Sequence, residues 1–204
     1  MAQANDPLKP VLDAVWRYQK RIQELIGSVF NKLRSSMGKA IAFMDNVVKY
    51  AKEIAKKVGK GVVNTIVSMR NRIFAAVNAV PGLAKSALKL GYRIIATIQK
   101  AADPNKVIKV VKKLFQTYVR MIRQLADYVS DMVAALDPVG KALKVIATFR
   151  LVLQMVFKWI ADVSGAATAV AKTRSLVRKA AKLLRAEVKD AVRVVKEVQR
   201  LKPA

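Results

Sequence analysis

The spacing of apolar residues constrains the fold of this chain more than any other feature of its sequence. After two Asp-Pro pairs, at 6–7 and 103–104, apolar residues recur in alternating steps of four and three. The two series are Val11, Val15, Tyr18, Ile22, Leu25 and Val29, then Val111, Phe115, Tyr118, Ile122, Leu125, Val129, Met132 and Leu136. This spacing is that of amphipathic helices packed at shallow angles, and strand-type alternation is absent over any comparable length. We therefore expect an all-α bundle of about five to seven amphipathic helices, some of them long.

Asp-Pro pairs and glycines predict where these helices begin and end. Asp suits the N-cap and Pro the first helical position, so the pairs at 6–7, 103–104 and 137–138 predict helix starts. Further breaks are expected near residues 37–38, 58–59, 81–82 and 164–165, although a helix can continue across a single Gly. The expected helices are 7–36, 39–57, 61–79, 82–101, 104–136, 138–163 and 168–201. The length suits one domain or two small ones, and we expect a single all-helical domain over 1–204 with an extended basic C-terminal helix, 168–201.

The segment 138–163 differs from the other expected helices because apolar residues surround most of its circumference. These residues are Val145, Ile146, Phe149, Leu151, Val152, Leu153, Val156, Trp159 and Ile160. A helix that is apolar all round is a buried one. The segment is therefore expected to be either the central core helix or a helix buried between subunits.

Eight cations lie along one line of the expected C-terminal helix. They are Arg174, Arg178, Lys182, Arg185, Lys189, Arg193, Lys196 and Arg200. Their spacing places them within an arc of about 100° and along about 39 Å of helix. The acids Glu187, Asp190 and Glu197 are expected on roughly the opposite side. Because like charges one turn apart repel, this row favours an anionic partner, and we interpret it as a nucleic-acid-binding surface.

The whole chain shares this imbalance of charge. Thirty-nine Lys and Arg face thirteen Asp and Glu, a net charge of +26, while 53% of the residues are apolar and can form a core. Such a charge attracts nucleic acid or anionic lipid. Residues 54–102 contain no acid, and the binding candidates there are Lys56, Lys57, Lys60, Arg70 and Arg72. The same stretch also holds the cations Lys85, Lys89, Arg93 and Lys100.

A second, shorter basic stripe follows in the segment 104–126. It consists of Lys106, Lys109, Lys113 and Arg120, without nearby acids. Each stripe could simply be the solvated face of an amphipathic helix. Ordinary solvated faces mix both signs of charge, however, so the single sign of these stripes favours binding.

The residue types that most enzymes and metal sites need are missing. The chain has no Cys and no His, which excludes disulfides, zinc fingers, haem ligation and histidine-based acid–base catalysis. No phosphate-binding loop pattern occurs, and Ser-x-x-Lys at 36–39 and 86–89 is expected by chance in so lysine-rich a chain. Asp127 and Asp131 could share a cation, but they are better explained as a solvated face balancing Arg120 and Arg123. We expect no enzymatic activity, no cofactor and no metal.

Secondary features bear on which polyanion is bound. Aromatic residues make up 6% of the chain and fall mostly on the apolar stripes, whereas base readers carry exposed aromatics. Charge spread over several long helices suits contacts to phosphates without sequence reading. Duplex DNA is therefore the favoured partner, with RNA possible and an anionic lipid or membrane surface as the alternative. A third reading is a basic subunit of a larger complex, bound to RNA or to acidic proteins.

The sequence also bears on targeting and membrane insertion. The N-terminus lacks a basic region followed by an apolar run, so no signal peptide is expected. The longest uncharged stretch, 73–84, has twelve residues and contains Pro81, whereas a spanning helix needs about 20. We therefore expect no transmembrane helix.

The combination of features resembles the major capsid proteins of filamentous archaeal viruses. It rests on the basic stripe over 174–200, the acid-free stretch over 54–102 and the Asp-Pro helix starts. This resemblance implies a helical bundle with arms that wrap linear double-stranded DNA, often as pairs of related subunits. It also implies a partner subunit, self or related, in a large assembly, and a location in a virion or an intracellular nucleoprotein.

Overall fold

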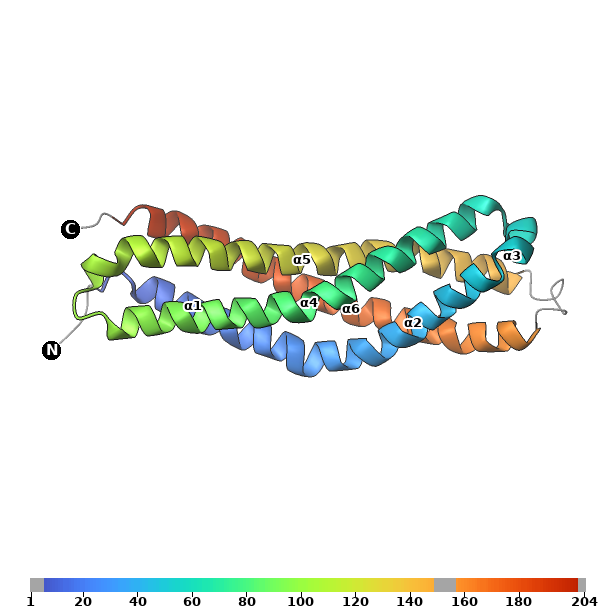
Figure 1. Cartoon of the computed structure of the whole chain (residues 1–204), viewed down its shortest axis with the longest axis horizontal. Coiled ribbons are helices and arrows are strands. Elements are labelled where there is room, and N and C mark those ends of the chain that lie inside the picture. Colours follow the sequence, from blue (N-terminus) through green and yellow to red (C-terminus); the bar gives the residue numbers. More distant parts are fainter. Residues whose placement is uncertain (1–5, 149–156, 202–204) are drawn as a thin grey trace. The chain divides into compact units, whose positions relative to one another are not determined.

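The chain folds into helices throughout the residues that its computed structural model describes, 6–148 and 157–201 (Figure 1). The elements are α1 (Lys9–Glu24), a π-helix (Leu25–Phe30), α2 (Asn31–Lys49), α3 (Ala51–Val58), α4 (Lys60–Lys100), α5 (Pro104–Thr148) and α6 (Phe157–Gln199). No strand occurs in these residues. The prediction of an all-α bundle with several long helices is confirmed.

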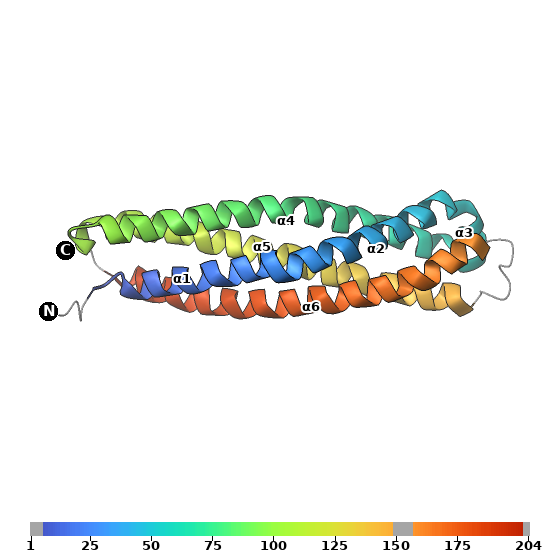
Figure 2. The same cartoon turned by 90° about the horizontal axis from the view of Figure 1, so that it is seen from below.

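Contacts between residues divide the chain into two compact units. Unit 1 contains Met1–Ser28, Val80–Asp127 and Lys182–Ala204. Unit 2 contains Val29–Ala79 and Tyr128–Ala181. The long helices α4, α5 and α6 each contribute one part to each unit, and their course can be followed in Figures 1 and 2.

The apolar seams expected from the sequence form the cores of both units. In unit 1 the first series is buried from Val11 to Ile22 on α1 and at Leu25 on the π-helix, and the second series is buried from Val111 to Leu125 on α5. Each of these residues is at most 3% exposed. In unit 2 the series continues with buried Val29 on the π-helix and Val129, Met132 and Leu136 on α5. Burial of these stripes supplies the main favourable free energy of folding.

Three of the expected helix boundaries correspond to features of the structure. Gly59, with φ 93°, separates α3 from α4. Helix α5 begins at Pro104, and Asp103 Oδ1 accepts a hydrogen bond from the backbone N–H of Asn105 at 3.0 Å, as a helix cap does. Asp6 Oδ1 accepts one from the N–H of Leu8 at 3.0 Å, and α1 begins shortly after, at Lys9.

The other expected breaks are wrong, because the helices continue through them. Residues 37–38 lie within α2, 81–82 within α4, 137–138 within α5 and 164–165 within α6. At Pro81 the buried neighbours Val80 and Ala84 hold the helix in the core, and this packing outweighs the loss of one backbone hydrogen bond. The expected C-terminal helix, 168–201, is the later part of α6.

The expected helix 138–163 is not a separate element. Its first residues form the end of α5, where Val139, Ala142 and Leu143 are buried but Val145 is 38% exposed. From Phe157 onward it belongs to α6. The other residues of its apolar set, from Ile146 to Ile160, have side chains outside the described part of the chain.

A buried polar cluster joins three helices of unit 1. The hydroxyl of Tyr118 on α5 donates to Gln19 Oε1 on α1 at 2.8 Å, and Gln19 Nε2 donates to the carbonyl of Leu88 on α4 at 2.8 Å. Gln19 is 1% exposed and Tyr118 fully buried, and burial raises the pKa of Tyr118 well above its usual value. Gly91 on α4 leaves the space that the Gln19 amide fills. These bonds fix the register of α1, α4 and α5 against each other.

Replacing Gly59 with alanine is expected to lower the free energy of unfolding by about 1–3 kcal/mol, because φ 93° is strained for a residue with a Cβ. Urea unfolding followed by circular dichroism measures this change. The control is Gly61→Ala, at the second residue of α4. A Cβ added at Gly61 would lie in open space, so this change should be neutral or stabilising. Equal effects at the two sites would contradict the prediction.

Candidate nucleic-acid interface

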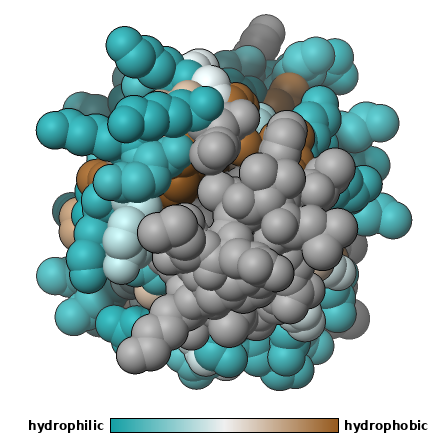
Figure 3. Space-filling model, turned by 90° about the vertical axis from the view of Figure 1, so that its right-hand side faces the viewer, coloured by the Kyte–Doolittle hydropathy of each residue, from teal (hydrophilic) through white to brown (hydrophobic). Residues whose placement is uncertain are grey.

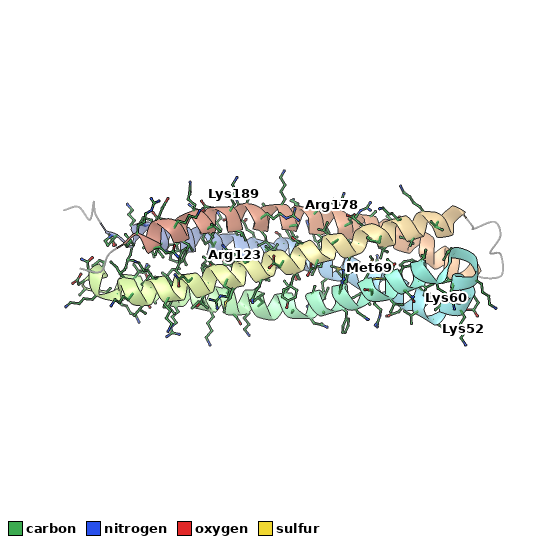
Figure 4. All side chains as sticks on the ribbon, turned by 90° about the horizontal axis from the view of Figure 1, so that it is seen from above. Lys52, Lys60, Met69, Arg123, Arg178 and Lys189 are labelled. Carbon is green, nitrogen blue, oxygen red and sulfur yellow. The ribbon has the colours of Figure 1, made fainter. Side chains whose placement is uncertain are left out.

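The part of the α6 stripe that lies in unit 1 is exposed along its length. Lys182, Arg185, Lys189, Arg193, Lys196 and Arg200 are all exposed. They project outward because Ala181, Leu184, Ala191, Val194 and Val198 are buried in the core. Figure 4 shows Lys189 pointing away from the helix. The cationic stripe predicted from the sequence is therefore available to a partner.

The two stripe residues in unit 2 have an acidic partner. Asp137 on α5 accepts from Arg178 at 3.0 Å and lies 3.6 Å from Arg174. Gly140 leaves room for this arrangement, since a Cβ there would lie 2.8 Å from Arg174 Nη1. Sequence reasoning missed the pairing because it assigned Asp137 to a helix cap.

The acids of α6 mostly face α1 within unit 1. Glu187 pairs with Arg21 at 3.1 Å, and Asp190 pairs with Arg17 and accepts from the Tyr18 hydroxyl at 3.0 Å. Asp190 also lies 2.6 Å from Arg193 of the stripe itself. The stripe is therefore less uniform than its sequence indicated, because Arg174, Arg178 and Arg193 all have acidic partners.

The surroundings of these two acids shift their pKa values in opposite directions. Burial acts to raise the pKa of Asp190, but the hydrogen bond from Tyr18 and the charge of Arg17 outweigh it and leave the pKa below its usual value. Partial burial raises the pKa of Glu187, and Arg21 only partly offsets this effect. Asp190 is thus a fixed negative charge between α1 and α6 at neutral pH.

The second stripe, on α5 in unit 1, is exposed and has no acidic partner in the described residues. It consists of Lys106, Lys109, Lys113 and Arg120. Lys112 lies beside this stripe but turns inward. Its ammonium donates to the carbonyl of Leu201 and lies 3.5 Å from the carbonyl oxygen of Gln199. A cation there stabilises the C-terminal end of α6, so Lys112 has a structural role that sequence reasoning did not identify.

The candidates of unit 2 are scattered. Lys56 and Lys60 line an open hollow of about 520 Å³ between α3 and the start of α4, together with Lys52, which Figure 4 labels with Lys60 at the same end. Figure 3 views this end of unit 2, where hydrophilic side chains dominate the coloured surface. The side chain of Lys57 lies outside the described residues. Other cations are Arg72, which is exposed, and Arg70, which pairs with Asp45 and lies over the Phe74 ring at 5.9 Å.

Among the described residues three aromatic side chains are exposed, and the others are buried or half-buried. Trp16 is 47% exposed, Phe74 51% and Tyr92 46%. Tyr92 is held by a hydrogen bond from Gln23 Nε2 to its hydroxyl at 2.6 Å. Trp16 and Tyr92 are each followed by an arginine in the sequence, and Arg70 lies over the Phe74 ring, so base stacking beside a cation is chemically open to each of these residues.

One helix is relevant to the lipid alternative. Among the described residues, α4 alone is long and apolar enough to cross a membrane, with a mean hydropathy of 1.2 over its most apolar window. Only 28% of that window is buried. A single such helix is weak grounds for a membrane span.

The site thus offers many exposed cations and little else. Within the described residues, no group of three or more acidic side chains is placed to hold a metal ion. The arrangement can attract and neutralise phosphates along several helices. No protein-family model matches the chain, and no curated protein matches it significantly.

Proposed function

We propose that this is a structural protein that coats or compacts duplex DNA through sequence-independent phosphate contacts, as a capsid or nucleoprotein subunit. The observation that supports it is the charge left after pairing. In the described residues, ion pairs with acids engage six arginines, namely Arg17, Arg21, Arg70, Arg174, Arg178 and Arg193. Exposed lysines outside these pairs, such as Lys85 and Lys89 of α4, Lys109 and Lys113 of α5 and Lys182 and Lys189 of α6, remain for a polyanion.

Self-repulsion supports the same conclusion. With +26 on 204 residues, exposed cations one helical turn apart destabilise the folded chain by a few tenths of a kcal/mol per pair, about 0.2–0.5. Phosphates along a duplex relieve this repulsion and release condensed counterions. In the described residues the exposed cations are spread over the long helices α4, α5 and α6 and are not gathered on one short helix, which favours contacts to the backbone over contacts to bases.

Affinity for duplex DNA should fall about 10³-fold or more between about 50 and 200 mM salt if six or more phosphates are contacted. Fluorescence anisotropy of two labelled duplexes of unrelated sequence measures this dependence, and both duplexes should give the same slope. Co-purified nucleic acid, detected by absorbance at 260 nm relative to 280 nm, gives an independent check. A flat salt dependence would rule out the proposal.

A lipid surface is the second candidate, favoured by the apolar window of α4 and the exposed rings of Trp16 and Phe74. Co-sedimentation with vesicles distinguishes the two. A DNA coat should bind anionic vesicles weakly and in a salt-sensitive way, and neutral vesicles not at all. Strong binding to neutral phosphatidylcholine vesicles would favour the lipid function.

A further inference from the structure

We propose that the hairpin of α4 and α5 in unit 1, rather than the α6 stripe, is the main surface on which DNA lies. This inference rests on the proposed function and names the surface that carries it. The hairpin consists of Val80–Lys100 of α4, the connection 101–103 and Pro104–Asp127 of α5. Its two helices run side by side in Figures 1 and 4, which view the molecule along perpendicular directions.

The hairpin brings together two stretches of cations that are separate in the sequence. From α4 come the last cations of the acid-free stretch, all exposed: Lys85, Lys89, Arg93 and Lys100. From α5 come the exposed cations of the second stripe and its neighbour: Lys106, Lys109, Lys113, Arg120 and Arg123. At 1.5 Å per residue the α4 row is about 23 Å long and the α5 row about 26 Å. Packed helix axes lie about 8–10 Å apart, so we treat the two neighbouring rows as one patch.

None of these hairpin cations forms an ion pair with an acid in the described part of the chain. The only acids of the hairpin are Asp103, in the connection, and Asp127, at the far end. Asp103 is used as a helix cap. The patch between them therefore presents one sign of charge, which is the condition for attracting phosphates along its length.

The other half of unit 1 has as many cations but far less net charge. The described parts of α1 and α6 in unit 1, residues 6–28 and 182–201, hold ten cations and six acids, a net +4. The hairpin, residues 80–127, holds ten cations and two acids, a net +8. Moreover, the ion pairs of Arg17, Arg21 and Arg193 all lie on the α1 and α6 side.

The patch also carries an oriented aromatic ring. Tyr92 is 46% exposed and lies one residue from Arg93, and its hydroxyl is anchored by Gln23 on α1. An anchored ring loses little side-chain entropy when a sugar or base packs on it. The hairpin therefore combines unpaired charge with a ring that is already positioned.

Two matched variants of the full chain test this inference. One replaces hairpin cations, Lys89→Gln, Arg93→Gln, Lys109→Gln and Lys113→Gln. The other replaces exposed α6 cations without an ion pair, Lys182→Gln, Lys189→Gln, Lys196→Gln and Arg200→Gln. Both sets remove three lysines and one arginine, so they change the net charge equally.

Binding to a random-sequence duplex should separate the two variants. If the hairpin carries the phosphate contacts, its variant loses about 10³-fold in affinity near 100 mM salt and the salt slope falls by about 3–4, while the α6 variant loses less than about tenfold. Equal losses, or a larger loss in the α6 variant, would overturn the inference while leaving the proposed function intact. No binding by the unmodified protein would instead reject the proposed function.

Lysine acylation of the unmodified protein, with and without duplex, gives a readout that does not depend on how the variants fold. Lys89, Lys109 and Lys113 should be protected by DNA more strongly than Lys182, Lys189 and Lys196. The reverse pattern of protection would overturn the inference. Circular dichroism of both variants should match that of the unmodified protein, because all the replaced side chains are exposed.

Discussion

Replacing Gly91 with alanine is expected to lower the free energy of unfolding by about 2 kcal/mol. This loss is expected even though alanine is intrinsically more favourable than glycine in a helix, by about 1 kcal/mol. A Cβ at position 91 would overlap the Gln19 amide and lie 2.7 Å from its Nε2. Gln19 could move only by breaking its bonds to Tyr118 and Leu88, and the Tyr118 hydroxyl would then be buried without a partner. Leaving such a group unsatisfied costs about 1–3 kcal/mol.

The same change at Gly82 provides the control, because Gly82 lies in the same helix and the same unit. Nothing lies within 4 Å of a Cβ at Gly82, so Gly82→Ala should stabilise the protein by about 0.5–1 kcal/mol. Urea unfolding followed by circular dichroism gives both values. If Gly91→Ala proved as stable as Gly82→Ala, the packing of Gln19 against α4 would be wrong.

Replacing Gln19 with methionine is expected to cost about 2–3 kcal/mol, because the buried Tyr118 hydroxyl loses its acceptor. Methionine keeps the length and flexibility of glutamine, so little packing is lost. Adding Tyr118→Phe removes the orphaned hydroxyl, and the double variant should recover to within about 1 kcal/mol of the unmodified protein.

A third variant controls for the residue type. Gln116→Met changes a glutamine that also follows an aromatic residue, on the exposed face of α5 in unit 1. Its effect should stay within about 0.5 kcal/mol. The single variant Tyr118→Phe completes the comparison. If the loss in the double variant equals the loss in Gln19→Met plus the loss in Tyr118→Phe, then Tyr118 and Gln19 are not coupled.

The two Asp-Pro pairs at 103–104 and 137–138 show how far local sequence reasoning reaches. Both are equally good helix starts by residue type. Asp103 acts as one, because α4 ends at Lys100 and the short connection 101–103 leads into α5. Asp137 does not, because α5 is packed on both sides of it and two arginines of α6 take its carboxylate. A helix start is therefore predictable only where tertiary packing does not compete for the same residues.

Gln19 and Gln116 make the same point for the interior. Each follows an aromatic residue on an amphipathic helix, yet Gln19 is buried in a hydrogen-bonded cluster and Gln116 is exposed. Whether a polar residue at the edge of an apolar stripe turns inward depends on a facing donor and on space left by a neighbouring helix. For Gln19, the donor is Tyr118, which lies 99 residues away in the sequence, and the space is left by Gly91.

The all-helical fold, the buried seams, the excess of positive charge and the exposure of the cationic stripes could be predicted from the amino-acid sequence. These follow from composition and from a period of three to four residues, which is a local property of the chain. Which acids neutralise which cations could be read only from the packing of the helices. The same packing brings the cations of α4 and α5 in unit 1 together, and these form no ion pair in the described residues. The reason is that ion pairing and shared faces depend on which helices become neighbours, and helical periodicity carries no information about that choice.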